Sequence, residues 1–206
     1  MSEENQKGIK NIEEIKKLYC STLKTIFDNI NYYISKKNIY YQEILEKTQK
    51  YMDKIDKLSG NFSINADKYF ILIYKSLTNE NYKLAKNIFP SIQILIKNNF
   101  LLGDTKLNEL RFDLEDINDN NIFKNGKIID LMIESFTSID LKFEDDDIWF
   151  FSMDCLDEII KNPNMNYNVK GNMFYKIYEY YLRIFSKVER DKDKLKYKRK
   201  NFFLNK

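Results

Sequence analysis

The chain has 206 residues, and its 34 Lys and Arg against 31 Asp and Glu leave a formal net charge of only +3. Because the two signs are interspersed, the sequence lacks the basic patch that a nucleic-acid interface requires, and we expect no nucleic-acid partner. Five Gly, two Pro and 43% hydrophobic residues offer little turn chemistry for a β protein. The composition therefore predicts an all-α chain, long enough to enclose one core as one domain.

Motifs that carry chemistry are scarce. The sequence has no histidine, which is the commonest general base near neutral pH and the commonest metal ligand. No glycine stands at the spacing of a Rossmann or P-loop phosphate cradle. We expect a non-enzymatic chain with no catalytic residue, cofactor or metal, and an enzyme that relies on carboxylate or tyrosine chemistry is the alternative.

The cysteines and the N-terminal residues indicate in which cellular compartment we expect the chain. Cys20 and Cys155 stand alone rather than in a CxxC pair, which predicts buried, inert thiols in a reducing compartment. No apolar run approaches the length of a membrane span, and Ser2 rather than glycine follows Met1. We therefore expect a cytoplasmic chain with neither a membrane-spanning helix nor a myristoylated N-terminus.

The N-terminal part of the chain contains two segments with the apolar spacing of an amphipathic helix. After a polar stretch, 1–8, that we assign to a disordered N-terminus, apolar residues recur at three and four from Ile9 to Ile34 and predict a long helix. A second rhythm runs from Ile44 to Leu58, and the cations of Lys36–Lys37 suit the negative end of the first helix. The two helices are expected to form an antiparallel hairpin.

The stretch 67–103 predicts two further helices joined by a tight turn. In the first, the six consecutive apolar or aromatic residues 69–74 leave no polar face, so we place this helix in the core. Asn65 or Asp67 is expected to cap it. The second helix keeps the three and four spacing, and Gly103 is expected to end the pair.

The C-terminal half is expected to begin with the longest loop. Residues 104–125 are rich in Asp and Asn and, apart from a short turn near Leu107, carry too few apolar residues to order themselves. The helical rhythm then resumes in three further segments, which begin near Lys127, Ile148 and Val169.

Two acidic clusters are candidates for a Mg²⁺ or Ca²⁺ site. Glu144 to Asp147 precede a predicted helix, where consecutive carboxylates splay outward and stabilise the positive end of its dipole, so a cap is favoured over a metal site. The loop acids lack the glycine and the distal glutamate of a calcium loop and are expected to be solvated; they are Asp113, Glu115, Asp116 and Asp119.

The tail, 191–206, is basic after Asp193. One interpretation places it on an anionic membrane, with these cations at the surface: Lys194, Lys196, Lys198, Arg199 and Lys200. The favoured interpretation is a solvated final helix or tail that leads to a further domain.

The helix pairs are each too thin to bury their own apolar stripe, so neighbouring pairs must stack. We expect an armadillo-like α-solenoid of antiparallel helix pairs, formed by one domain over 9–190; a compact helical bundle is the alternative. Most of the 15 Tyr and 15 Phe are expected in the core. The remainder could form a partner surface, because aromatic residues are enriched at interface centres.

Three sequence blocks between about residues 60 and 190 resemble, in the same order along the chain, blocks of a known family. They are Lys68-Tyr69-Phe70 followed by Leu84, Ile92-Gln93, Leu95-Ile96 and Leu101-x-Gly103; Gly126 to Asp130 with Ile133-Glu134; and Val169 to Ser186 with Gly171. Together they are similar to the N-terminal DCB (dimerisation and cyclophilin-binding) domain of the large Golgi Arf guanine-nucleotide exchange factors, the BIG class. The first block matches that family's KYF and its LQKLI helix, the second its GKKLID helix start, and the third its closing helix.

The chain departs from that family at three positions. Leu72 replaces a proline, Ile94 replaces a lysine that follows the glutamine, and Pro90 falls inside one continuous helix of the family. Since a proline removes one hydrogen bond from a helix, a kink near 86–89 is favoured over a helix that restarts at Pro90.

The resemblance implies a non-catalytic regulatory domain of a large Arf exchange factor, peripheral on Golgi or trans-Golgi membranes. The partners it implies are a second copy in a homodimer, the adjacent homology-upstream domain and an Arf-like small GTPase. The matched positions that would contact a partner are Lys68, Tyr69, Phe70 and Gln93, for which plain helix packing is the alternative. The alternative functions are a related Golgi scaffold without an exchange domain and a membrane-surface module that uses the basic tail.

Overall fold

The computed structural model describes residues 3–34, 39–58, 62–77, 82–110, 126–139 and 146–190. All regular structure in these ranges is helical, apart from one isolated antiparallel bridge between Lys106 and Lys127. The elements are α1 (Glu3–Tyr33), α2 (Ile39–Asp56), α3 (Asp67–Leu77), α4 (Tyr82–Lys97), the short 3-10 helix η1 (Leu107–Glu109), α5 (Ile128–Thr137), α6 (Asp146–Lys161), α7 (Pro163–Asn166) and α8 (Gly171–Arg190). The all-α prediction is confirmed; the loop acids of 111–125 lie outside the described residues.

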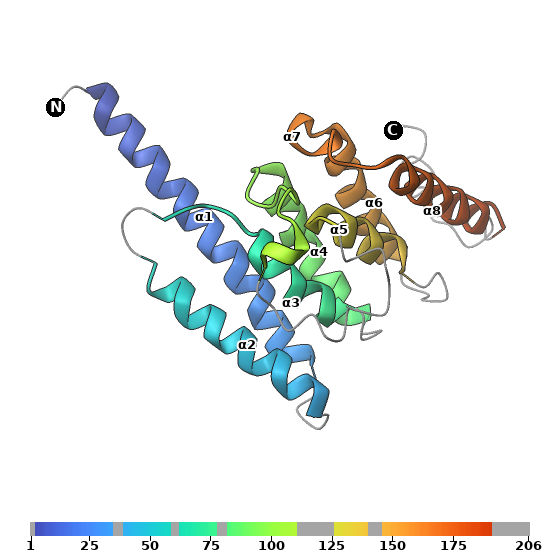
Figure 1. The fold of residues 1–206 in the computed structure, drawn as a ribbon, viewed down its shortest axis with the longest axis horizontal. Coiled ribbons are helices and arrows are strands. Elements are labelled where there is room, and N and C mark those ends of the chain that lie inside the picture. Colours follow the sequence, from blue (N-terminus) through green and yellow to red (C-terminus); the bar gives the residue numbers. More distant parts are fainter. Residues whose placement is uncertain are drawn as a thin grey trace.

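The helices pack in two connected rows. In one row α1 contacts both α2 and α4, and α4 contacts α6; in the other, α5 contacts both α3 and α8. Contacts of α3 with α1 and α2, and of α6 with α5 and α8, join the rows around one continuous apolar core. Figure 1 shows the α1–α2 hairpin at one side of the molecule and α8 at the opposite edge.

The α1–α2 hairpin forms as the sequence predicts. Phe27 of α1 stacks on Tyr51 of α2 with ring centroids 6.0 Å apart, and Lys24 forms an ion pair with Asp56. One boundary differs, because α1 already begins at Glu3, within the stretch assigned to a disordered N-terminus. Gly8 disfavours a helix interior by only about 1 kcal/mol, and residues 3 to 9 contain no proline.

The buried carboxylate of Asp67 joins α3 to the chain that follows α4. Asn65, not Asp67, caps α3, because its Oδ1 accepts a hydrogen bond of 2.7 Å from the Asp67 amide. Asp67 Oδ1 accepts from the amides of Leu102 (3.0 Å) and Gly103 (2.9 Å), and Oδ2 from the amide (3.1 Å) and hydroxyl (2.8 Å) of Thr105. One fully buried side chain therefore fixes the whole turn.

Two residues of the turn after α4, Asn99 and Gly103, have different roles. Asn99 takes the left-handed conformation that ends the helix (φ 56°), and the amide of Phe100 donates to the carbonyl of Leu95 at 2.8 Å. Gly103, which we expected to end the pair, instead permits close packing. A Cβ on Gly103, whose φ is +70°, would lie 2.8 Å from Cβ and 2.9 Å from Cα and N of Ile129 at the start of α5.

The centre of the core is α4, which lies between α1 and α6. The helix runs unbroken through Pro90, so the interpretation in which a helix restarts there is wrong. The thiol of Cys155 in α6 donates to the carbonyl of Phe89 at 3.7 Å, and complete burial raises the pKa of that thiol well above its usual range. The prediction of a buried thiol is confirmed for Cys155, whereas Cys20 is half-buried.

Candidate interaction surface

The inner face of α8 is anchored to the core by both apolar and polar contacts. Its buried residues are Met173, Ile177, Tyr180 and Ile184. The hydroxyls of Tyr180 and Ser152 share a hydrogen bond of 2.7 Å, and the hydroxyl of Tyr181 donates to Asp157 Oδ1 at 2.5 Å. The ammonium of Lys187 lies 4.3 Å from the ring of Trp149. Because α8 is held at several points against α6, its rotation about its own axis is fixed.

The outer face of α8 carries a second apolar stripe, which we call the α8 outer stripe. It consists of Phe174 (41% exposed), Tyr175 (68%), Tyr178 (62%), Leu182 (47%) and Phe185 (48%). At about 100° of rotation per residue these five side chains cover an arc of roughly 100°, centred more than a right angle from the buried face. Since α8 lies at the edge of the molecule (Figure 1), no other described helix covers this stripe.

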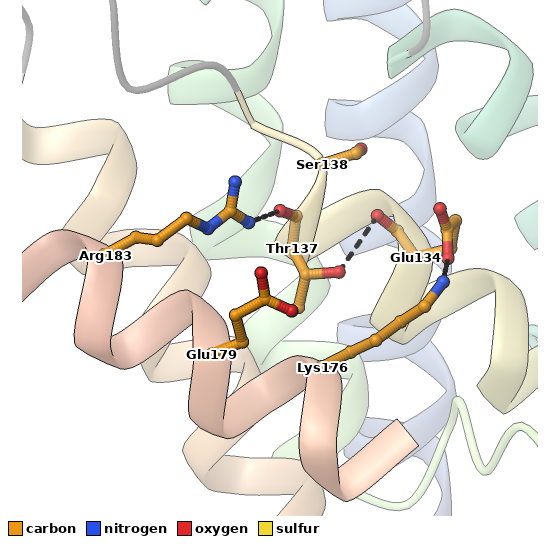
Figure 2. Close-up of a pocket in the computed structure, with 6 residues that line it drawn as sticks. All are labelled: Glu134, Thr137, Ser138, Lys176, Glu179 and Arg183. Atoms are coloured by element: carbon orange, nitrogen blue, oxygen red, sulfur yellow. Dashed lines mark hydrogen bonds and ion pairs between the residues drawn. The ribbon is translucent and has the colours of Figure 1, made fainter. Parts of the chain in front are cut away.

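A polar hollow of about 250 Å³ lies between α8 and the end of α5. Lys176 forms an ion pair with Glu134, and the guanidinium of Arg183 donates to the carbonyl of Thr137 at 2.9 Å. Figure 2 shows Glu179 between these two contacts, with its carboxylate directed into the hollow. Arg183 lies at the carboxyl end of α5, where a cation stabilises the negative end of the helix dipole.

The charges around this hollow balance. Two carboxylates, Glu134 and Glu179, face two cations, Lys176 and Arg183, and hydroxyls of Thr137 and Ser138 complete the wall. The arrangement offers hydrogen bonds of both kinds and no preference for one sign of ligand. In the described part of the chain, no three Cys, Asp or Glu side chains gather where they could hold a metal ion.

None of the protein-family models, curated proteins or solved structures compared with the chain matches it. The functional assignment therefore depends on the residues and their geometry.

Three of the residues matched to the DCB family, Lys68, Tyr69 and Phe70, lie at the start of α3, and two of these three are core. Tyr69 is enclosed by Tyr51 and Phe27, with ring centroids 4.9 and 5.8 Å away, and Phe70 packs 6.4 Å from Phe136. Burial and the nearby thiol of Cys20 raise the pKa of Tyr69. Tyr69 and Phe70 therefore present almost no surface to a partner.

Two of the matched positions reach the surface. Lys68 is exposed, and its ammonium lies 4.9 Å from the ring of Tyr69. Partial burial and the charge of Lys54 lower the pKa of Lys68. Gln93 lies half-buried on α4. A partner contact at Lys68 and Gln93 stays a prediction, and it would occupy a different part of the molecule from the α8 outer stripe.

The basic tail, with Lys194, Lys196, Lys198, Arg199 and Lys200, lies outside the described residues. No helix of the described ranges combines the length and the apolar character that a bilayer crossing requires. An anionic-surface contact by the tail stays a prediction.

The sequence analysis did not locate the α8 outer stripe, because it expected most aromatic residues in the core and did not say which of them would form a partner surface. The sequence does contain the signal. Apolar residues follow the helical spacing along two separate lines, one at 173, 177, 180 and 184 and one at 174, 178, 182 and 185. A helix that is apolar on two sides must either be enclosed or have a partner.

Proposed function

We propose that this chain is a non-catalytic, helical protein-interaction domain that binds its partners through the α8 outer stripe. The observation that carries the proposal is the exposure of five aligned apolar side chains on a helix whose orientation is fixed by the core. At the ~200 Å² that an aromatic side chain can bury, this stripe presents about 500 Å² of contact surface. A contiguous patch of that size on a monomer commonly marks a binding site.

The composition of the stripe suits a protein partner. Four of its five residues are Tyr or Phe, which supply large contact areas with few rotatable bonds and are enriched where interfaces are most deeply buried. Glu179 and Arg183, beside the stripe, would form the polar rim around such an apolar centre. The partner surface is therefore expected to be apolar with charges of both signs at its edge.

We further propose, on the resemblance of the three sequence blocks, that the domain belongs to the regulatory region of a large Golgi Arf exchange factor. The two connected rows of helices support an armadillo-like α-solenoid as the finer description of the fold. In this proposal the domain is cytoplasmic and peripheral on Golgi membranes, and its partners are a second copy, the homology-upstream domain and an Arf-like GTPase. A related scaffold without an exchange domain would differ in the sequence that follows residue 206.

A pull-down tests both parts of the proposal. The bait is the purified chain, and the candidates are Arf-like GTPases held in the GTP state and the isolated homology-upstream domain. We expect capture of at least one candidate and a loss of about tenfold or more with Leu182→Glu, because a charge in the stripe stays unpaired at a dry interface. The control is Tyr32→Glu, which alters a side chain that is 80% exposed on α1.

The outcomes separate the two parts. Capture that Leu182→Glu leaves unchanged would overturn the α8 outer stripe as the docking surface. Capture of no GTPase and no homology-upstream domain would overturn the exchange-factor assignment.

A further inference from the structure

We infer that the apolar end of this chain's own tail, Phe202 to Leu204, packs on the α8 outer stripe and blocks it until a partner displaces the tail. The inference rests on the proposed function, in which the stripe is a docking surface, and it adds a regulation of that surface. It is carried by the exposure of the stripe, by the length and composition of the chain that follows α8, and by the charges on α6 beside α8.

The stripe residues that the inference uses are accessible. Phe174, Tyr175, Tyr178 and Leu182 are between 41% and 68% exposed. The hydroxyl of Tyr181, on the neighbouring side of α8, is bound to α6, so the helix cannot turn these four side chains inward. An apolar patch of this kind on a free chain favours aggregation unless something covers it. A segment of the same chain is always present to do so.

The tail is long enough to reach the stripe. Sixteen residues follow Arg190, the last residue of α8, and Phe202 is the twelfth of them. A reversing turn uses about four of these twelve, and the other eight span about 12 Å as a helix or about 26 Å when extended. Along the α8 axis Leu182 lies about 12 Å and Tyr178 about 18 Å from Arg190. Phe202 therefore reaches Leu182 in either conformation.

The end of the tail has the composition that an apolar surface requires. Phe202, Phe203 and Leu204 are consecutive apolar residues in a segment that is otherwise mostly Lys, Arg and Asn. Each phenylalanine can bury about 150–250 Å², so the two together match much of the stripe. A short linker gives an effective concentration of about 1 mM. Even a contact with a millimolar dissociation constant would then cover the stripe about half of the time.

The charges beside the stripe favour a basic occupant. The hydroxyl of Tyr181 donates to Asp157 of α6. Burial raises the pKa of this hydroxyl, and the hydrogen bond with Asp157 and the charges of Asp157 and Asp154 add to the rise. Both carboxylates therefore lie at the α6 side of α8.

The net charges of the two segments are opposite. Helix α6, which packs against α8, carries five acidic residues and one basic residue, a net charge of −4. The tail, 191–206, carries seven basic and two acidic residues, a net charge of +5. A tail that lies along α8 brings its cations to this acidic helix. An anionic membrane on the same face would instead meet like charges.

Thiol accessibility in the full chain tests the inference. The reporter is Tyr178→Cys in a Cys20→Ser background, in which the remaining thiol, Cys155, is fully buried. The measurement is the rate at which the reporter reacts with a maleimide. We expect Phe202→Ser combined with Phe203→Ser to raise this rate at least twofold, because the tail no longer covers the reporter. An equal rate with and without these tail substitutions would overturn the inference.

Two controls make the rate specific to the contact. Asn201→Ser combined with Asn205→Ser alters the same part of the tail without removing an apolar side chain, and it should leave the rate unchanged. A second reporter, Tyr32→Cys, replaces a side chain that is 80% exposed on α1, and its rate should not respond to the tail substitutions. Circular dichroism should show the same helical fold for every variant.

The pull-down separates this inference from the proposed function. The chain with Phe202→Ser and Phe203→Ser should capture at least twofold more partner, because a partner no longer competes with the tail. Capture that occurs without any protection of the Tyr178→Cys reporter would retain the proposed function and overturn only the tail contact. Protection of the reporter without capture by either chain would retain the tail contact and overturn the docking role of the stripe.

Two other arrangements of the tail have distinct signatures, and each would overturn the inference. A tail that covers the stripe of a second copy would protect the reporter at 100 μM chain but not at 1 μM, whereas contact within one chain is independent of concentration. A tail that binds an anionic membrane would make the chain float with phosphatidylserine vesicles and would leave the reporter unprotected in their absence.

Discussion

The helices α3 and α8 are both rich in aromatic residues, but they differ in how many of their apolar side chains are buried. In α3 the five residues from Tyr69 to Ile73 are each no more than 2% exposed, because helices cover that element on several sides. In α8 one line of apolar residues is buried and a second line stays exposed. Consecutive apolar residues leave a helix no face for water, whereas two separated stripes leave one side for a partner.

The largest expected effect separates these two helices directly. Phe70→Ala in α3 should lower the free energy of unfolding by about 3–5 kcal/mol, because it leaves a large cavity in the core. Phe185→Ala in α8 removes the same atoms from the outer stripe and should change it by less than about 0.5 kcal/mol. Urea denaturation followed by circular dichroism, at a concentration where the chain is monomeric, measures both values.

The variants Phe70→Ala and Phe185→Ala can contradict this comparison of α3 with α8. A loss above about 2 kcal/mol for Phe185→Ala in the monomer would mean that the stripe is part of the core. The same variant should, by contrast, weaken capture in the pull-down by several-fold, because Phe185 lies within the α8 outer stripe.

The second effect concerns the carboxylate that holds α3 in place. Asp67→Ala should destabilise the fold by about 2–4 kcal/mol, because it leaves the amides of Leu102, Gly103 and Thr105 without an acceptor. Asp67→Asn keeps one acceptor oxygen and should cost less than Asp67→Ala. Asp147→Ala, which removes an exposed carboxylate that pairs with Lys86, is the control and should cost under about 1 kcal/mol. Equal losses for Asp67→Ala and Asp147→Ala would contradict the role of Asp67.

Local patterns predict most of the fold. Apolar residues spaced three and four positions apart predict every described helix longer than one turn. The apolar run of 69–74 predicts that other helices enclose α3. Contacts between distant residues escape such patterns. Nothing near Asp67 in the sequence indicates that its carboxylate binds a turn 35 to 38 residues away, and nothing near Gly103 indicates Ile129 as its neighbour.

The candidate site was harder to predict than the fold. Hydrophobic periodicity shows that a residue prefers burial, but it does not distinguish burial in the same chain from burial against another molecule. Phe174 and Ile177 therefore look alike in the sequence of α8, although one is 41% exposed and the other 2%. The family resemblance directed attention to Tyr69 and Phe70, which are core residues of α3. Only the arrangement of neighbouring helices separates the two kinds of apolar residue.

The smallest expected effect is a pH dependence of the free energy of unfolding that arises from Asp104. Partial burial, the charge of Asp67 and a hydrogen bond with Asp67 raise the pKa of Asp104 above its usual value of 3.8. The folded chain therefore binds this proton more tightly than the unfolded chain, and the ionised form of Asp104 destabilises the fold at neutral pH. Asp104→Asn should raise the free energy of unfolding at pH 7, within the ~0.5 kcal/mol typical of exposed sites, since solvent screens the repulsion.

The size of this stability gain decreases as the pH falls. As the pH falls through the raised pKa of Asp104 toward 3.8, Asp104 becomes protonated and neutral in the folded chain, and the advantage of Asp104→Asn should shrink to nothing. Thermal melts of both proteins between about pH 3.5 and 7.5 measure the difference. Glu109→Gln removes another exposed carboxylate of the same connection, which pairs with Lys106 at 3.8 Å, and should show no such gain at pH 7. A gain for Asp104→Asn that persists unchanged at pH 3.5 would mean that the asparagine stabilises the turn by a contact of its own rather than by relieving the repulsion from Asp67.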